Sequence, residues 1–270
     1  MRHSELRFDA RTWLVVFIGC AVACALVPAR SAAQSDSAST SVAPSAAPAP
    51  PEPMRVPPPP QSGEGWQPGL HYSVILGKAA THAPPGKVEV LELFMYTSPL
   101  SYEIQGALGA WRARKPDYIE YRREPSIVFP HARLQARTFF TLQALGREDL
   151  HQALFSWIFE KDHYPVYHTI EHPDVAGYLR LNLEFARAHK LDQDRFAAIY
   201  GSKELDDKVI KAEIATHGYL VSGTSTFVVN GRYSTSVQRV SYPKGNIGPE
   251  DYARLFQLIE YLAATEAARK

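Results

Sequence analysis

The chain has 270 residues, with 29 lysine and arginine residues against 28 aspartate and glutamate residues. This near-neutral balance argues against a nucleic-acid-binding protein or one that depends on an anionic membrane surface, because both need a basic surface. The two cysteines, Cys20 and Cys24, lie in an apolar N-terminal stretch, so the rest of the chain is expected to hold no disulfide framework and to perform no thiol chemistry.

Residues 1–33 have the pattern of a signal peptide. A basic beginning precedes an apolar run from Trp13 to Val27, which is shorter than a membrane span. Ser31-Ala32-Ala33 supplies the small residues that signal peptidase requires, so we expect cleavage after Ala33 and export to the periplasm. The alternatives are an uncleaved anchor, the one case in which we expect membrane contact, and a lipoprotein lipidated on Cys24.

Residues 34–65 are rich in alanine, serine and proline. Such a segment has too little apolar surface to offset the entropy of ordering. We therefore predict a disordered linker that tethers the following domain, residues 66–270.

The first part of this domain is predicted to contain three extended segments and one helix. The extended segments are 70–76, 88–94 and 118–128. The helix is expected to begin at Ser98-Pro99, because serine is a preferred N-cap and proline a preferred first helical residue. Pro116 should end it after Lys115.

The middle of the domain is predicted to be helical. Apolar residues at helical spacing, with Gly146, Asp192 and Gly218 as cap or stop residues, indicate five helices, at 134–145, 150–159, 175–189, 192–200 and 205–217. Pro165 and Pro173 are expected to bracket a loop. We interpret residues 131–218 as a helical insertion.

The last part returns to β-structure. Asn230-Gly231 lies between two β-rich runs and predicts a hairpin with a type I′ turn. An amphipathic helix is expected from about Pro249 to the end. The order of elements predicts an α/β unit that is split by the helical insertion.

Two strings carry a resemblance to a known family. Val90-Leu91-Glu92-Leu93-Phe94 leads into Ser98-Pro99-Leu100-Ser101-Tyr102, and Val221 to Tyr233 forms the second string. In both, the chain resembles the DsbA family, which are periplasmic thiol:disulfide interchange proteins. The resemblance covers roughly residues 69–262 and implies a thioredoxin-like fold with an inserted all-helical subdomain.

The resemblance also places four substitutions in the family's redox site. Ser98 and Ser101 stand where the family has cysteines, and Leu100 stands where it has histidine. Ser225 stands at the position of a cis-proline. A cis bond before a non-proline residue costs about 2.5–4 kcal/mol, so we expect the Thr224-Ser225 bond to be trans.

Glu92 corresponds to a buried acid of the family. With no thiol nearby, it is interpreted as a remnant, as a surface strand residue or as part of a new site. Ser98 is expected to act only as a helix cap.

These substitutions predict a non-catalytic member that binds an envelope protein or peptide, or acts as an assembly factor. No catalytic residue, metal or cofactor is expected. The residues proposed to bind the partner are Tyr96, Leu100, Tyr102, Thr224, Ser225 and Phe227.

Other functions remain as alternatives. Thiol:disulfide interchange is the activity that the family name implies. Ser98-Pro99 also resembles the start of the kappa-class glutathione transferases and isomerases, in which Ser98 would stabilise a thiolate. A serine hydrolase would need a base and an oxyanion hole beside Ser98, and His131 is the nearest candidate base. His163, His168 and His172 match no standard zinc spacing, so a solvated loop is expected there.

Overall fold

The computed structural model describes residues 65–77, 79–160, 163–168 and 173–269. The expected signal peptide and all but the last residue of the expected linker lie outside these residues. Within the described part, no helix combines the length and the hydropathy that crossing a membrane requires.

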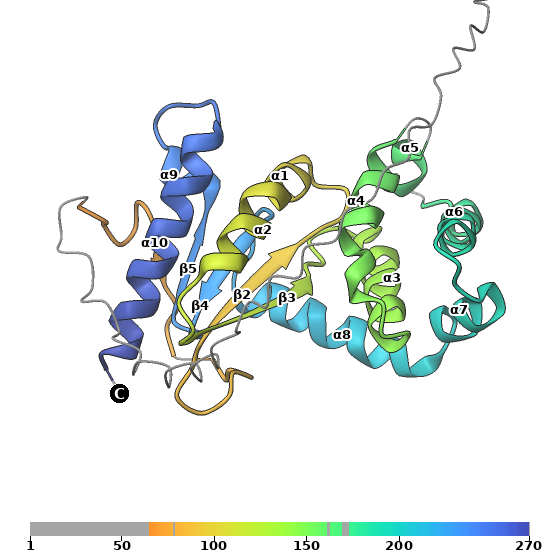
Figure 1. The fold of residues 1–270 in the computed structure, drawn as a ribbon, viewed down its shortest axis with the longest axis horizontal. Coiled ribbons are helices and arrows are strands. Elements are labelled where there is room, and N and C mark those ends of the chain that lie inside the picture. The colour runs from red at the N-terminus through yellow and green to blue at the C-terminus, as the bar shows by residue number, and fades with distance from the viewer. Residues whose placement is uncertain (1–64, 78, 161–162, 169–172, 270) are drawn as a thin grey trace, which may run out of the picture. The chain divides into compact units, whose positions relative to one another are not determined.

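A five-stranded sheet has the order β1-β5-β4-β2-β3 (Figure 1). Its strands are β1 (Ser73–Val74), β2 (Val88–Phe94), β3 (Ile119–Pro125), β4 (Thr226–Val229) and β5 (Tyr233–Ser236). β2 and β3 are parallel, and the other pairs are antiparallel. The expected strand at 70–76 is reduced to two residues, which pair with Tyr233 and Ser234 of β5.

Helices from both ends of the domain cover one face of this sheet. They are α1 (Pro99–Glu103), α2 (Gln105–Arg114), the short α9 (Val237–Ser241), which we did not predict, and α10 (Pro249–Ala267). Trp111 of α2 stacks on Phe256 of α10 with their ring centroids 5.0 Å apart. Val88 and Val90 of β2 pack in the same cluster, so this layer fixes α1 and α2 above the central strand.

The segment between β3 and β4 is helical throughout most of its length. Its elements are α3 (Ala132–Ala144), the 3-10 turn η1 (Glu148–Leu150), α4 (His151–Phe159), α5 (Tyr164–Tyr167), α6 (Val175–Ala188), α7 (Gln193–Tyr200) and α8 (Lys203–Gly218). They enclose a second core that includes Phe139, Phe155 and Phe185, and Phe94 at the end of β2 packs into it.

The segment between Pro165 and Pro173 is less irregular than expected. Tyr164–Tyr167 forms a helical turn, α5. Tyr167 is buried and donates a hydrogen bond to Asn182 of α6 over 3.0 Å. The turn is therefore held by a long-range contact, which the two prolines do not predict. Residues 169–172 lie outside the described residues.

The predicted hairpin is confirmed. Asn230 and Gly231 both have positive φ, at 50° and 65°, which is the geometry of a type I′ turn. β4 then runs antiparallel to β2, with Thr226 opposite Leu93. The loop that precedes β4 and the helix that follows β2 are thus brought to the same end of the two central strands.

Candidate functional site

Ser98 is the residue that joins α1 to the loop before β4. Its hydroxyl accepts a hydrogen bond from the Ser101 N–H at 3.3 Å, so the predicted N-cap is confirmed. The same hydroxyl donates to the Thr224 carbonyl at 3.2 Å. Ser98 is almost completely buried. Its oxygen is therefore engaged both as a donor and as an acceptor.

The peptide bond between Thr224 and Ser225 is cis, so our expectation of a trans bond was wrong. That expectation rested on the general cost of a cis bond before a residue other than proline. Both residues are buried, and both are tied to the helix or the central strand: Thr224 accepts from Ser98, and Ser225 donates to Glu92 at 2.9 Å. The general cost takes no account of these tertiary contacts.

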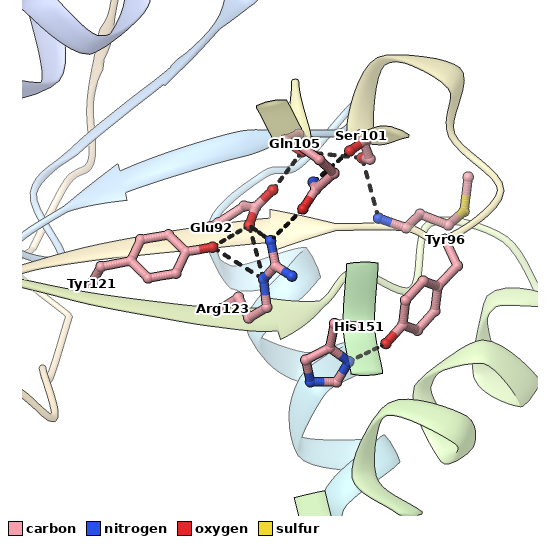
Figure 2. A network of polar contacts seen from close by, with 9 residues as sticks. Glu92, Tyr96, Ser101, Gln105, Tyr121, Arg123 and His151 are labelled. Carbon is pink, nitrogen blue, oxygen red and sulfur yellow. Dashed lines mark hydrogen bonds and ion pairs between the residues drawn. The ribbon is translucent and has the colours of Figure 1, made fainter. Parts of the chain in front are cut away.

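Glu92 lies at the centre of a buried polar network below α1 (Figure 2). Its side chain is fully buried, which excludes the interpretation as a surface strand residue. One carboxylate oxygen accepts from Ser225, and the other pairs with the guanidinium of Arg123 at 2.8 Å. Tyr121 donates to that second oxygen as well. Ser225 lies 3.1 Å from Ser101, which extends the network to α1.

Arg123 of β3 supplies the positive charge of this network. Its guanidinium also donates to the Gln105 side-chain carbonyl at 3.0 Å and lies over the ring of Phe94. Burial alone would lower the pKa of Arg123. The neighbouring Glu92 carboxylate acts in the opposite direction and holds that pKa above its usual value. Burial and the Glu92 charge together raise the pKa of Tyr121, so its hydroxyl keeps its proton and donates. Glu92 is thus neutralised by a fixed ion pair.

The residues that we predicted to bind a partner do not form one surface. Tyr96 and Phe227 are fully buried in two different clusters. Tyr102 is partly buried and stacks on Phe159, with 4.6 Å between ring centroids. Leu100 is partly buried as well. Thr224 and Ser225 lie beside Ser98, as the resemblance implied.

A hollow of about 320 Å³ lies beside the loop before β4. It is lined by Tyr219, Leu220, Ser222, Gly223, Thr226, Ser234, Thr235, Ser236, Gln238 and Arg239. Most of these side chains carry hydroxyl or other polar groups. Leu220, by contrast, is apolar and 88% exposed, so it gives this otherwise polar hollow an apolar edge.

The histidines that we considered show no catalytic arrangement. His131 is buried and stacks on Phe129, and no hydrogen bond joins it to Ser98 among the described residues. His168 packs edge-on against His131 with 5.6 Å between ring centroids. Within the described ranges, no three histidine, cysteine or acidic residues are grouped so that they could hold a metal ion. His172 lies outside those ranges.

Sequence reasoning found Glu92, Ser98, Ser101 and Ser225 but missed Arg123 and its neighbours. Parallel pairing places Glu92 directly opposite Arg123, and opposite charges on paired strands are a usable signal. Using it requires the register of β2 and β3, which the sequence alone does not provide.

Relatives of the chain were found at the level of sequence and of structure. No family model matches it. It is 31% identical to the thiol:disulfide interchange protein DsbA of Azotobacter vinelandii over 176 residues, which is 64% of this chain and 77% of the relative. The DsbA of Pseudomonas aeruginosa is 28% identical over 68% of this chain and 82% of its own length.

The solved structures that resemble this chain are also DsbA proteins. The crystal structure of Pseudomonas aeruginosa DsbA has a TM-score of 0.62 and 26% identity, and the match covers 77% of this chain and 99% of that one. The oxidoreductase DsbA of Xylella fastidiosa has a TM-score of 0.59 and 26% identity, with 73% and 96% covered. The sheet and the inserted helices therefore form a thioredoxin-like fold of the DsbA type. The chain belongs to the DsbA family of thiol:disulfide interchange proteins.

Proposed function

We propose that this DsbA-family protein is exported to the periplasm, where it binds proteins or extended peptides without exchanging disulfides. The observation that carries the proposal is that Ser98 and Ser101 occupy the start of α1, beside the loop before β4. Disulfide exchange requires a thiolate that attacks a sulfur atom and forms a mixed disulfide. A serine hydroxyl provides no such chemistry.

The distribution of cysteines supports the loss of this activity. The sequence has cysteine only at positions 20 and 24. Cleavage after Ala33 would remove both and leave a chain without any thiol. The periplasmic location is supported by the pattern of the first 33 residues and by membership of the DsbA family.

The hollow beside the loop before β4 supports the binding role. Leu220 offers an exposed apolar contact, and the neighbouring Ser222, Ser234 and Ser236 offer hydroxyl groups. An extended peptide presents alternating side chains and free backbone N–H and C=O groups, so it can satisfy both kinds of contact. This combination favours an unfolded segment over a rigid globular partner.

Binding can be tested with a fluorescent, unfolded peptide whose cysteines are alkylated, so that no disulfide can form. Fluorescence anisotropy should show saturable binding that is weakened in Leu220→Ser. Leu76→Ser is the matched control, because Leu76 is 96% exposed and does not line the hollow. An absence of binding, or equal weakening by the two variants, would contradict the proposal.

Thiol:disulfide interchange is the second candidate, and the names of the relatives favour it. In this chain the reaction would have to use Cys20 and Cys24, the two cysteines present. Reduction of insulin and oxidation of a dithiol peptide by the purified chain would support this candidate. Cys20→Ala/Cys24→Ala should then abolish turnover.

The glutathione-transferase alternative meets an obstacle at Ser98. A hydroxyl that stabilises a thiolate must donate its proton to sulfur, whereas the Ser98 hydroxyl donates to the Thr224 carbonyl. Thermal stabilisation by glutathione that is lost in Ser98→Ala would restore this alternative. Co-purification of one stoichiometric envelope partner would instead favour an assembly factor over a general peptide binder.

A further inference from the structure

A cavity of about 600 Å³ lies where α2 and β3 meet η1 and α4. Its lining residues are Gln105, Leu108, Gly109, Arg112, Tyr121, Arg122, Arg123, Gln143, Glu148, Asp149, His151 and Gln152. None of them lines the hollow beside Leu220, so the two features are separate. The volume lies within the range of sites that hold small organic ligands.

His151 lines this cavity, and its imidazole is held in place by a hydrogen bond with Tyr96. Its Nδ1 lies 2.5 Å from the hydroxyl of Tyr96. Burial raises the pKa of Tyr96, so its hydroxyl keeps its proton. No other acceptor for that proton lies among the described residues, so we assign it to the hydrogen bond with Nδ1. The proton of the neutral imidazole must then reside on Nε2. Nε2 points away from Tyr96 (Figure 2), is buried and has no acceptor among the described residues.

Two guanidinium groups line the same cavity. Arg123 uses Nε and Nη2 for Glu92, Tyr121 and Gln105, and its Nη1 makes no hydrogen bond within the described part of the chain (Figure 2). Arg112 is exposed and lies over the ring of Tyr121, 4.7 Å from its centroid. Burial and then the charge of Arg123 lower the pKa of the His151 imidazole to about 3; Asp149 opposes this shift and Arg112 adds to it.

Other parts of the lining limit the charge and shape of a ligand. Glu148 and Asp149 oppose a multiply charged anion, although Asp149 is already paired with Arg147 at 2.9 Å. Leu108 and the ring of Tyr121 provide apolar wall. A guanidinium binds a planar carboxylate through two parallel hydrogen bonds, which a spherical ion cannot accept. A single carboxylate on an apolar body therefore fits this lining.

We propose that the cavity between α2, β3 and α4 binds a small organic monocarboxylate, with Arg112 and Arg123 contacting the carboxylate and His151 forming the wall beside them. Because Arg123 also holds Glu92, the ligand would contact the back of the buried network below Ser101. The site is independent of the proposed peptide-binding function, since it uses different residues.

Isothermal titration of the full chain with benzoate tests this site, and benzamide serves as the uncharged probe of equal shape. Benzoate should bind with saturation below about 10 mM, and benzamide should bind at least about tenfold more weakly. Arg112→Gln should weaken benzoate binding about tenfold, and Arg112→Lys should recover part of the loss. Arg114→Gln on the same helix removes the same charge outside the cavity and should leave binding unchanged.

A second measurement locates the ligand. Benzoate should shift the imidazole nitrogen resonances of His151, and these should report a proton on Nε2 already in the free protein. The proposal is overturned by an absence of benzoate binding, by equal binding of benzamide, or by equal effects of Arg112→Gln and Arg114→Gln. Tighter binding of inorganic phosphate or sulfate than of benzoate would overturn the carboxylate assignment.

Discussion

The hydroxyl of Ser225 lies 2.9 Å from a carboxylate oxygen of Glu92 and donates to it. Ser225 has one proton to give, so its contact with Ser101 at 3.1 Å is one in which Ser101 donates. The loop before β4, the central strand and α1 are thus joined by a directed chain of hydrogen bonds. In this member of a disulfide-exchanging family, the hydrogen bonds connect the hydroxyl groups of Ser101 and Ser225 to Glu92. Glu92 is already paired with Arg123.

Removal of the Glu92 charge should destabilise the protein strongly. Glu92→Gln leaves Arg123 buried without its charged partner, which costs about 3–5 kcal/mol in the free energy of unfolding. Urea denaturation measures the loss. Glu120→Gln on β3 is the control, because Glu120 forms an exposed pair with Lys87 at 3.7 Å and should cost less than about 1 kcal/mol. Equal effects of the two variants would contradict this description of the network.

Ser225→Ala should have a smaller effect than Glu92→Gln. It removes one hydrogen bond to a charged group, which contributes about 1.5–3 kcal/mol to the free energy of unfolding. Ser222→Ala, three residues earlier and exposed, should change stability by less than about 0.5 kcal/mol. Identical unfolding midpoints for the two variants would show that the hydrogen bond from Ser225 to Glu92 contributes nothing to the free energy of unfolding.

A thiol placed at position 98 should have a lowered pKa. In Ser98→Cys the sulfur would occupy the N-cap of α1 and accept from the residue 101 N–H, an arrangement that lowers the pKa of a thiol. Alkylation by iodoacetamide as a function of pH measures that pKa. Because position 98 is buried, the quantity compared with the exposed reference Ser222→Cys is the pH at the midpoint of the alkylation curve, which does not depend on the absolute rate. Equal thiol pKa values in Ser98→Cys and Ser222→Cys would contradict the expected effect of the N-cap position.

Acid should destabilise the protein through His131. Burial, followed by the neighbouring His168, lowers the pKa of His131 from 6.5 to about 4. Between these values the unfolded chain binds a proton that the folded protein does not, so stability is lost as the pH falls from about 6.5 toward 4. The loss is at most about 1.4 kcal/mol per pH unit.

His131→Phe should reduce this pH dependence. Phenylalanine keeps the ring that stacks on Phe129 and removes two buried nitrogens that have no partner among the described residues. Urea denaturation at pH 7.5 and pH 5 should therefore show a smaller difference in the variant than in the parent protein. An unchanged difference would mean that His131 is protonated in the folded state.

Much of the fold follows from local signals. Val88–Phe94 was predicted as a strand with the observed bounds, and the Asn230-Gly231 turn and the Asp192 cap were also predicted. These features depend on neighbouring residues in the sequence. The short β1 and the helical turn at Tyr164–Tyr167 depend on distant partners, β5 and Asn182 respectively. Local periodicity carries no information about such contacts.

The site was predictable only in part, for the same reason. Ser98 is a cap by virtue of its place before Pro99, which the sequence shows directly. The pairing of Glu92 with Arg123 depends on the register of β2 and β3, and the contacts of Thr224 and Ser225 join residues 126 and 133 positions apart in the sequence. The residues we expected at a binding surface failed to converge because Tyr96 and Phe227, although aromatic, are needed in two separate cores.

The rate of disulfide formation in a dithiol peptide tests the central claim most directly. The protein should be purified from export-competent cells, and its N-terminus should be fixed by intact-mass measurement. We predict cleavage after Ala33 and a peptide-oxidation rate equal to that without protein, while the alkylated form of the same peptide still binds. A rate clearly above the uncatalysed one would contradict the account and would establish thiol:disulfide interchange in its place.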